Sequence, residues 1–441
     1  MSLVVLGASA NIQVSVDSSP FWDRSESSIA ANPLNSLNIV GASKRFYDPP
    51  DYGFVLAAYA TFDGGSTWSE APPLQLGAGW GGISDPAVAW DGVGNAYLVA
   101  LPFNPGTPPD LAAGPIVGIA VYQSTDGGNT WGAPNLIHTS SGDDKQGAAG
   151  DWNSASPFFG NVYAAWDDGS NLAFARTTDN GATWLGVGAQ PVGTPLAFGD
   201  SFSPEPTVAD DGTLYIAWAA GSDIKFVKST DGGESFSAPA VVATGITPLS
   251  SPPLPAPDGF PELPGAKFRV VTIASACAGT GGVFTVAWAD YREGVSRVYY
   301  RTSTGGGTNW LGGPSGQPLL TGAVASLPTQ HDFHPQLACT PSGQIACCFY
   351  ELGPVVGYGP SLINVVIAAS IDGGVSFPYR LTVTDRPWDP AVDAPLSHGR
   401  PTTTFIGDYF GLAASDAGFF PFWTDTRTGI QEMFTARATI S

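Results

Sequence analysis

Apolar and polar residues alternate in short runs along most of the chain, and glycine-containing turns separate the runs. The clearest examples are NAYLVAL at 95–101, TLYIAWA at 213–219 and VFTVAWA at 283–289. A period of two places alternate side chains on opposite faces of a strand, so each run predicts a strand with one buried face. Shorter runs precede them, such as DPAVAWD at 85–91 and PEPTVAD at 204–210. The pattern predicts an all-β fold of antiparallel sheets.

A motif of Ser/Thr-x-Asp-x-Gly-x-Thr/Ser-Trp/Phe recurs between these strands. Copies lie at 61–68, 124–131, 177–184, 229–236 and 370–377, and a degenerate copy with Gly305 in place of the aspartate lies at 303–310. The Asp-Gly pair suits a tight turn with positive φ, and the aspartate can accept hydrogen bonds from the amides of that turn. The final aromatic residue can pack under a neighbouring sheet. We expect these aspartates to shape turns rather than to catalyse a reaction.

The spacing of the copies suits four-stranded blades arranged around an axis. Seven inner strands are expected, beginning near Ser28, Asp85, Phe158, Glu205, Val270, Pro335 and Gly411. The last unit lacks a fourth strand, and the alternating stretch NIQVSVDSS at 11–19 is suited to complete it. We predict one closed seven-bladed β-propeller over residues 11–441, with six blades as the alternative. Residues 1–10 are expected to be a tail, the remnant of a signal or an added start.

These repeats resemble the Asp-box, or BNR, repeat of the sialidase-like propeller superfamily. The resemblance covers nearly the whole chain and implies a β-propeller. The superfamily includes sialidases, other glycan-cleaving enzymes, sorting-receptor ectodomains and photosystem assembly factors, so the fold alone does not determine the activity. Sialidases carry a Phe/Tyr-Arg-Ile-Pro segment near the N-terminus. The nearest counterpart here is Trp22-Asp23-Arg24-Ser25, which does not match it.

Composition and charge restrict the partners. The chain has 441 residues, 56 glycines, 39 prolines and a net charge of −21. Nucleic acid is a poor partner for such an acidic surface, whereas a calcium ion would be electrostatically welcome. No apolar run approaches the ~20 residues of a membrane span. We expect a secreted monomer with a carbohydrate or glycoconjugate ligand and no required cofactor.

Polar residues just before the inner strands should gather at one mouth of the central channel. The candidates are Glu26, Asp85, Asp151, Glu205, His331, Asp332, His334 and Asp408. We expect Asp85, Glu205 and Asp408 to do acid–base work on a glycan, and His334 to bind it. A set of carboxylates and histidines could equally hold a metal ion. The alternative is that each residue only caps its own strand or turn.

Arginines would orient an acidic sugar at the same mouth. The motif Trp-x-Asp-x-Arg-x-Gly occurs at 288–294 and 423–429 and places Arg292 and Arg427 where the second strand turns into the third. A guanidinium group can hold a carboxylate through two hydrogen bonds. The alternative is that each arginine pairs with the aspartate of its own turn. Further arginines border the starts of inner strands, namely Arg24, Arg269 and Arg400.

Several tryptophans lie in loops outside the repeat and can stack on a sugar ring. They are Trp22, Trp80, Trp152 and Trp388. Packing within the loops is the alternative. Three loops are longer than a propeller needs, at 102–116, 237–268 and 378–408. Long loops on a rigid scaffold often carry binding sites.

The four cysteines, Cys277, Cys339, Cys347 and Cys348, do not have the spacing of a zinc site. Cys339 and Cys347 flank a turn, so they are candidates for a cross-strand disulfide, with buried free thiols as the alternative. Two functions remain in competition. The first is a glycan-cleaving enzyme of the glycoside hydrolase type, and the second is a propeller that binds glycan or protein without catalysis. A structural module stabilised by a metal ion is a third, minor alternative.

Overall fold

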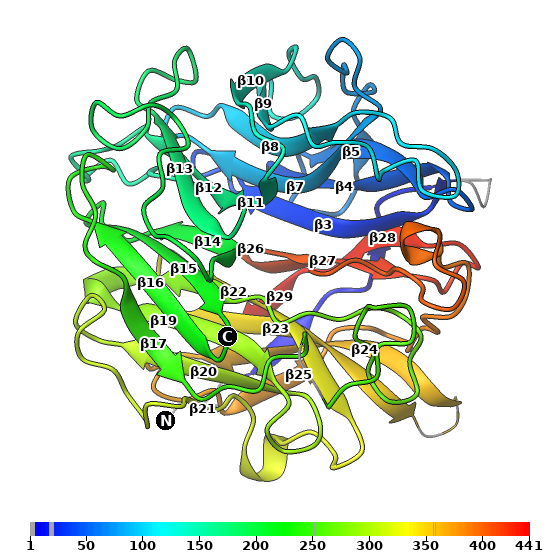
Figure 1. Ribbon diagram of the computed structural model, residues 1–441. Helices are drawn as coiled ribbons and strands as arrows, with labels where there is room; N and C mark the ends of the chain where they lie inside the picture. The colour runs from blue at the N-terminus through cyan, green and yellow to red at the C-terminus, as the bar shows by residue number, and fades with distance from the viewer. Residues whose placement is uncertain (1–4, 17–21, 251–252, 356, 358) are drawn as a thin grey trace.

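The chain forms a ring of seven β-sheets around a central axis (Figure 1) in a computed structural model that describes residues 5–16, 22–250, 253–355, 357 and 359–441. The predicted all-β, seven-bladed propeller is confirmed. Apart from strands, the described residues contain three short 3₁₀ helices, η2 (Thr280–Gly282), η3 (Gly322–Val324) and η4 (Ser397–Gly399). None of the described helices has the length and apolar character needed to cross a membrane.

The blades follow one another along the chain, each running from the axis outward. Blade 1 comprises β3 (Arg24–Ala31), β4 (Ile39–Asp48), β5 (Gly53–Thr61) and β6 (Ser69–Glu70). Blade 2 comprises β7 (Gly82–Trp90), β8 (Ala96–Phe103), β9 (Ile119–Ser124) and β10 (Asn135–His138). Blade 3 comprises β11 (Asp143–Gly150), β12 (Val162–Asp168) and β13 (Asn171–Thr177). Blade 4 comprises β14 (Phe202–Val208), β15 (Leu214–Ala220), β16 (Asp223–Ser229) and β17 (Ala240–Thr244). Blade 5 comprises β18 (Ser275–Ala278), β19 (Phe284–Asp290), β20 (Arg297–Ser303) and β21 (Gln317–Pro318). Blade 6 comprises β22 (His331–Cys339), β23 (Ile345–Val355), β24 (Gly359–Ser370) and β25 (Tyr379–Thr382).

Blade 7 joins the two ends of the chain. Its strands are β26 (Gly411–Ser415), β27 (Gly418–Asp425), β28 (Glu432–Thr435) and β29 (Ala438–Ile440), together with β1 (Leu6–Ala8) and β2 (Ile12–Gln13). Ile12 pairs with Thr435, so β2 completes this blade as the stretch at 11–19 predicted. Residues 17–19 of that stretch lie outside the described part. β1 pairs with β29, so the segment expected to be a tail contributes a strand.

Each complete copy of the repeated motif closes the turn between the third strand of a blade and its outer edge. Asp63 shows the arrangement, because its Oδ1 accepts hydrogen bonds from the amides of Ser66 and Thr67, both at 2.9 Å. The hydroxyl groups of Thr61 and Thr67 donate to the same carboxylate at 2.8 and 2.7 Å. These hydrogen bonds lower the pKa of Asp63 to about 2. The aspartate therefore acts as a turn-forming residue.

Large aromatic side chains fill the interior of the blades. The second strands of blades 3, 4, 5 and 7 each contribute one tryptophan that is at most 1% exposed, namely Trp166, Trp218, Trp288 and Trp423. They pack in the apolar clusters between neighbouring blades. This agrees with their interpretation from the sequence as packing residues. The axis is left to the inner strands, which are rich in small and polar residues.

One inner strand differs from its predicted position. The third inner strand was expected near Phe158 but is β11, and Phe158 lies in a turn after it. Asp151 therefore follows the inner strand rather than preceding it, and it lies at the other end of the channel with Trp152. The expectation failed because β11, with the sequence DDKQGAAG, has no large apolar residue to mark it as a strand.

Candidate functional site

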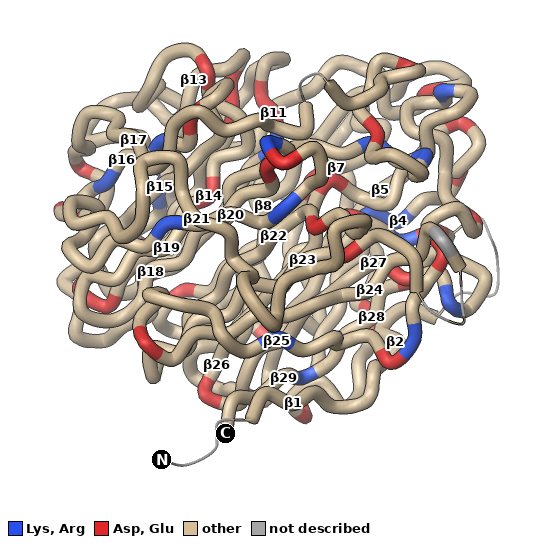
Figure 2. Tube along the Cα trace, turned by 90° about the horizontal axis from the view of Figure 1, so that it is seen from below, with Lys and Arg blue, Asp and Glu red and all other residues tan. Residues whose placement is uncertain are grey.

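A cavity of about 390 Å³ opens at the mouth of the channel, on the side where the inner strands begin. Acidic and basic positions lie close together there, around β7, β8 and β11 near the axis (Figure 2). Charged residues from blades 1, 2 and 3 and from the loops before blades 5 and 7 line the cavity, namely Glu26, Lys44, Asp85, Asp143, Asp144, Lys145, Arg269 and Asp408. Of the residues predicted to gather at one mouth, Glu26, Asp85 and Asp408 line this cavity, while Asp151, Glu205, His331, Asp332 and His334 do not.

The backbone of the inner strands directs several of these side chains. Five inner strands carry a β-bulge near their start, with a residue of positive φ between 29° and 54° at each one. These residues are Glu26, Asp85, Lys145, Ser203 and His334. A non-glycine residue in this conformation costs about 1–3 kcal/mol, and a bulge redirects the side chain it carries. Glu26, Asp85 and Lys145 use it to line the cavity.

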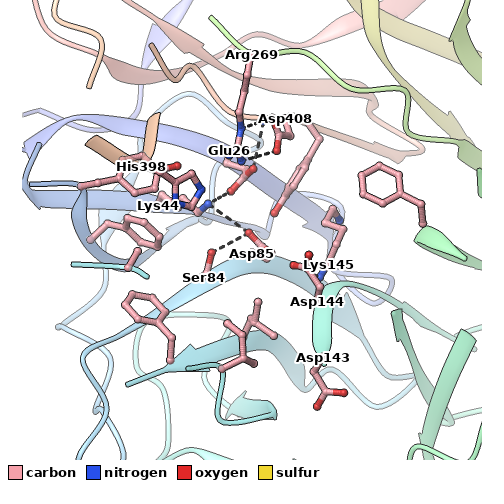
Figure 3. A pocket seen from close by; sticks show the side chains of 18 of the residues that line it. Glu26, Lys44, Ser84, Asp85, Asp143, Asp144, Lys145, Arg269, His398 and Asp408 are labelled. Atoms are coloured by element: carbon pink, nitrogen blue, oxygen red, sulfur yellow. Dashed lines mark hydrogen bonds and ion pairs between the residues drawn. The ribbon is translucent and has the colours of Figure 1, made fainter. Parts of the chain in front are cut away.

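A buried lysine joins two of these carboxylates (Figure 3). The Lys44 ammonium group on β4 forms an ion pair with Glu26 and lies 3.4 Å from Oδ1 of Asp85. Ser84 donates a hydrogen bond of 2.8 Å to the same oxygen of Asp85. The ammonium group also lies 4.7 Å from the ring centre of Phe54. The glutamate and the lysine are each at most 5% exposed in their side chains, so water screens the pair poorly.

A second ion pair closes the other side of the cavity. Arg269 holds Asp408 through two hydrogen bonds, from Nε at 3.0 Å and from Nη2 at 2.6 Å. The backbone amide of Asp408 donates to Glu26 at 3.2 Å, which connects the two ion pairs. The guanidinium group of Arg269 also lies 4.6 Å from the ring centre of Phe405. Asp408 therefore orients Arg269, and both of its carboxylate oxygens accept hydrogen bonds from the guanidinium group.

The carboxylates of the cavity differ in their protonation. Burial opposes ionisation of Asp85, but the ammonium groups of Lys44 and Lys145 outweigh it and hold the pKa of Asp85 below its usual range. Burial, and then the negative charge of Asp85, raise the pKa of Asp144 to about 6. Burial also raises the pKa of Glu26 to about 8, against the attraction of Lys44. At mildly acidic pH the cavity thus holds an ionised Asp85 beside a protonated Asp144.

Lys145 differs from the two other described Lys and Arg residues that line the cavity, Lys44 and Arg269. Its ammonium group donates to the carbonyl of Gln146 at 3.2 Å and lies 4.0 Å from the ring centre of Tyr409. No described carboxylate lies within ion-pair distance of it, whereas Lys44 and Arg269 are both paired. Two tyrosine hydroxyl groups at the cavity, Tyr52 and Tyr409, are buried without a described hydrogen-bond partner. The arrangement offers one positive charge and two hydroxyl donors.

The three long loops predicted from the sequence meet beside the cavity. His398 in the third loop accepts or donates a hydrogen bond of 2.9 Å with Asp110 in the first loop. Asp258 in the second loop accepts hydrogen bonds from the backbone amide and hydroxyl group of Thr402, at 2.8 and 2.6 Å. The ring of His398 stacks on Phe260, with centres 5.6 Å apart. These contacts fix the loops as one wall, and His398 lines the cavity.

The structure separates the predicted catalytic carboxylates. Asp85 and Asp408 line the cavity at the mouth, while Glu205 lines an adjoining cavity of about 170 Å³ deeper in the channel. Burial raises the pKa of Glu205 to about 7. His334 is 2% exposed, and neither ring nitrogen has a described partner. Burial lowers the pKa of His334 to about 4, so it is neutral, and it does not line either cavity.

Three predicted arginines are used by the protein itself. Arg292 pairs with Asp290 of its own turn, and Arg427 pairs in the same way with Asp425. Arg24 is fully buried and lies 3.1 Å from Glu70. None of the three lines the mouth cavity. Arg292 and Arg427 thus match the alternative interpretation, in which each arginine pairs with the aspartate of its own turn. The aspartate two residues earlier lies within reach of the guanidinium group in both turns.

The predicted tryptophans also lie away from the cavity. Trp388 is 1% exposed and packs with Tyr350 at a ring distance of 5.7 Å, so it is a core residue and offers no face to a sugar. Trp80 packs against the apolar cluster between blades 1 and 2. Trp152 is 45% exposed but lies at the opposite end of the channel. Sugar stacking at the mouth therefore has no tryptophan among the residues that line it.

One described cluster has the composition of a metal site. His138, Asp143 and Asp168 each offer a ligand atom, and these atoms lie within 4.8 Å of one another. The protein already uses them in hydrogen bonds: His138 bonds Asp143 at 2.8 Å, Trp166 donates to Asp143 at 2.8 Å, and Ser140 donates to Asp168 at 2.8 Å. The cluster is satisfied without an ion, and calcium binding stays a prediction.

Sequence reasoning missed Lys44, Asp144 and Lys145. Asp144 and Lys145 lie on β11, which was not recognised as an inner strand. Their charges in the segment DDKQ were the available signal, since β3, β7 and β22 also carry charged residues near their start. Lys44 lies on a second strand, where nothing in the alternation distinguishes an inward-facing lysine from an exposed one.

No protein-family model and no curated protein matches this sequence. Solved structures are similar in fold. A protein of unknown function from Dyadobacter fermentans is 12% identical with a TM-score of 0.52, over 99% of both chains. The Hadza microbial sialidase Hz136 is 13% identical with a TM-score of 0.47, over 94% of this chain and 65% of the other. The NanB sialidase of Streptococcus pneumoniae is 12% identical with a TM-score of 0.47, over 77% and 66% of the two chains. At such identity the likeness concerns the fold alone.

Proposed function

We propose that this protein cleaves glycosidic bonds in acidic glycans at the mouth of the channel, with Asp144 as the general acid and Asp85 as its ionised partner. The observation that carries the proposal is the opposite shift in pKa of these two carboxyl groups, which line one cavity. Glycoside hydrolases use such a pair, one carboxylic acid and one carboxylate, on either side of the bond that breaks.

The proposed roles follow from the protonation states. Protonated Asp144 donates its proton to the glycosidic oxygen as the bond to the leaving sugar breaks. The negative charge of Asp85 stabilises the positive charge that develops on the sugar ring in the transition state. Water then adds to the anomeric carbon and gives a proton back to Asp144, which completes the hydrolysis. Lys145, which has no described carboxylate partner, pairs with the carboxylate of the acidic sugar. Lys44 and Arg269 hold the remaining carboxylates in place.

Turnover of fluorogenic uronosides and sialosides between pH 4 and 8 tests this proposal. Wild type should be most active below about pH 6, because Asp144 loses its proton above that value. Asp144→Asn and Asp85→Asn should each lower kcat by about 10²–10⁴-fold. Arg292→Gln, which changes a residue outside the cavity, is the matched control and should retain activity.

The second candidate is a propeller that binds acidic glycans without cleaving them. The ion pairs of Lys44 and Arg269 favour it, because side chains that are already held in place by ion pairs are well suited to rigid recognition. Binding on a glycan array without turnover of any substrate would contradict the hydrolase and favour this function. Loss of that binding in Lys145→Met would place the ligand at the same cavity.

A further inference from the structure

Two cysteines face each other across the seam between blades 5 and 6. The inner strands β18 and β22 run side by side there, and the amide of Leu337 donates to the hydroxyl group of Ser275 at 2.9 Å. Two residues further along each strand are Cys277 and Cys339, whose Sγ atoms lie 2.6 Å apart. The two strands therefore place these cysteines at matching positions.

The same position joins another pair of blades. Between blades 1 and 2, the amide of Val88 donates to the hydroxyl group of Ser28 at 3.0 Å. Two residues further along, the indole of Trp90 donates to the carbonyl of Ala30 at 3.0 Å. Two hydrogen bonds thus join the neighbouring inner strands β3 and β7, one from an amide to a hydroxyl group and a second one two residues further along. At blades 5 and 6 the residues at the position of this second hydrogen bond are the two cysteines.

We propose that Cys277 and Cys339 form a disulfide bond that joins the inner strands of blades 5 and 6. Non-bonded heavy atoms keep about 3.5–4.0 Å between them, so two separate thiol groups at this contact would repel each other. The pairing expected from the sequence, Cys339 with Cys347, does not fit the register. Cys347 pairs with Leu337, and Cys339 pairs with Ile345.

The site is accessible to a small oxidant. Cys339 is half-buried, and both cysteines line a cavity of about 220 Å³ in the channel, which also includes Trp152. A small-molecule disulfide supplies the oxidising equivalents. The Cys339 thiolate attacks one of its sulfur atoms and releases one thiol, which leaves a mixed disulfide. The Cys277 sulfur, after losing its proton to solvent, then attacks Sγ of Cys339 and releases the second thiol.

Mass spectrometry of the intact protein tests the proposal. The purified protein is fully reduced, then incubated with oxidised glutathione, and the remaining thiols are alkylated. We expect a product about 2 Da lighter before alkylation, with two alkylatable thiols in place of four. Its melting temperature should exceed that of the reduced protein by about 4 °C, because the bond closes a long loop in a large chain.

Variants assign the bond, because Cys339, Cys347 and Cys348 share one tryptic peptide, residues 302–380. Cys277→Ser and Cys339→Ser should each abolish the 2 Da loss, while Cys347→Ala and Cys348→Ala should retain it. Four alkylatable thiols in oxidised wild type would overturn the proposal. So would a stable glutathione adduct, or a 2 Da loss that persists in Cys339→Ser.

Discussion

Replacing Lys44 with methionine should destabilise the fold through two carboxylates that then lack their cation. The Lys44 ammonium group pairs with Glu26 and lies 3.4 Å from Asp85, and its side chain is 5% exposed. Removing one partner of a buried ion pair costs about 3–5 kcal/mol. The unfolding entropy is about 2.1 cal/mol/K per residue, so in a chain of this length each kcal/mol lost from the free energy of unfolding lowers the melting temperature by roughly 1 °C. The melting temperature of Lys44→Met should therefore fall by about 3–5 °C at pH 7.

The pH dependence identifies the cause of this loss. The folded pKa of Glu26 is raised from 4.5 to about 8, and removal of Lys44 raises it further. Below about pH 8 Glu26 is largely protonated with or without Lys44, so its share of the deficit should appear only as the pH rises through that value. Lys44 also lowers the pKa of Asp85, and the stability from this lowered pKa is present above the unfolded value and lost as the pH falls, so the deficit of Lys44→Met should shrink toward pH 4.5. Differential scanning calorimetry at pH 4.5, 6 and 8 measures it. The double variant Lys44→Met/Asp85→Asn should recover much of the loss at pH 7.

An equal deficit at every pH, or no recovery in the double variant, would refute this explanation. The loss would then come from the contact of the Lys44 side chain with the rings of Phe54 and Phe405 rather than from its pairing with carboxylates. Lys44→Gln is the matched control for packing, because it keeps most of the stem and removes the charge. It should behave as Lys44→Met does.

Three further predictions concern other parts of the molecule. Lys145→Met should weaken binding of an acidic glycan at least tenfold, as measured by calorimetry, and leave the melting temperature within about 1 °C, since Lys145 has no described ion-pair partner. Deletion of residues 1–16 should lower the melting temperature by about 5 °C or more, because it exposes the edge of β28. The exposed edge should also make the protein associate, which size-exclusion chromatography detects. Ser203→Gly should raise the melting temperature by about 1 °C, because it relieves a positive φ of 54° and removes a buried hydroxyl group without a described partner; an unchanged or lower value would contradict the assigned strain.

Much of the fold was predictable because the ring repeats one arrangement. Alternation identified the second and third strands, and the incomplete last unit together with the stretch at 11–19 predicted the closure through β2. The location of the mouth followed from the direction of the inner strands. Glu26, Asp85 and Asp408 were therefore among the candidates, since each immediately precedes or begins an inner strand.

Blade 3 shows why part of the site was not predictable. Its inner strand contains glycines where neighbouring backbone comes close: a Cβ at Gly150 would lie 1.7 Å from the carbonyl oxygen of Trp90, and one at Gly147 would lie 2.6 Å from the carbonyl oxygen of Pro204. Strands that pack through backbone need no large apolar side chains, so alternation does not reveal them. Asp144 and Lys145 were not predicted as site residues because they lie on this unrecognised strand.

The partners of the arginines and tryptophans depend on side-chain direction, which a motif does not contain. The guanidinium groups of Arg292 and Arg427 turn back to their own turns, whereas Arg269, which belongs to no motif, reaches across to Asp408. A carboxylate two residues earlier can pair with an arginine while ordering only a short stretch of chain, so little conformational entropy is lost. An arginine without such a local carboxylate is therefore the better candidate for a site, and this rule selects Arg269.

The repeated bulge links the fold to the proposed chemistry. Five inner strands hold a non-glycine residue in the left-handed region, at about 1–3 kcal/mol each. Asn or Gly would fit this conformation at lower cost, yet the residues at the mouth are Glu26, Asp85 and Lys145. A purely structural bulge would not need charged side chains, and burying them adds a further desolvation cost. The cost is understandable if these charges face a ligand, and under the proposed function Lys145, which has no described ion-pair partner, would meet the acidic group of that ligand.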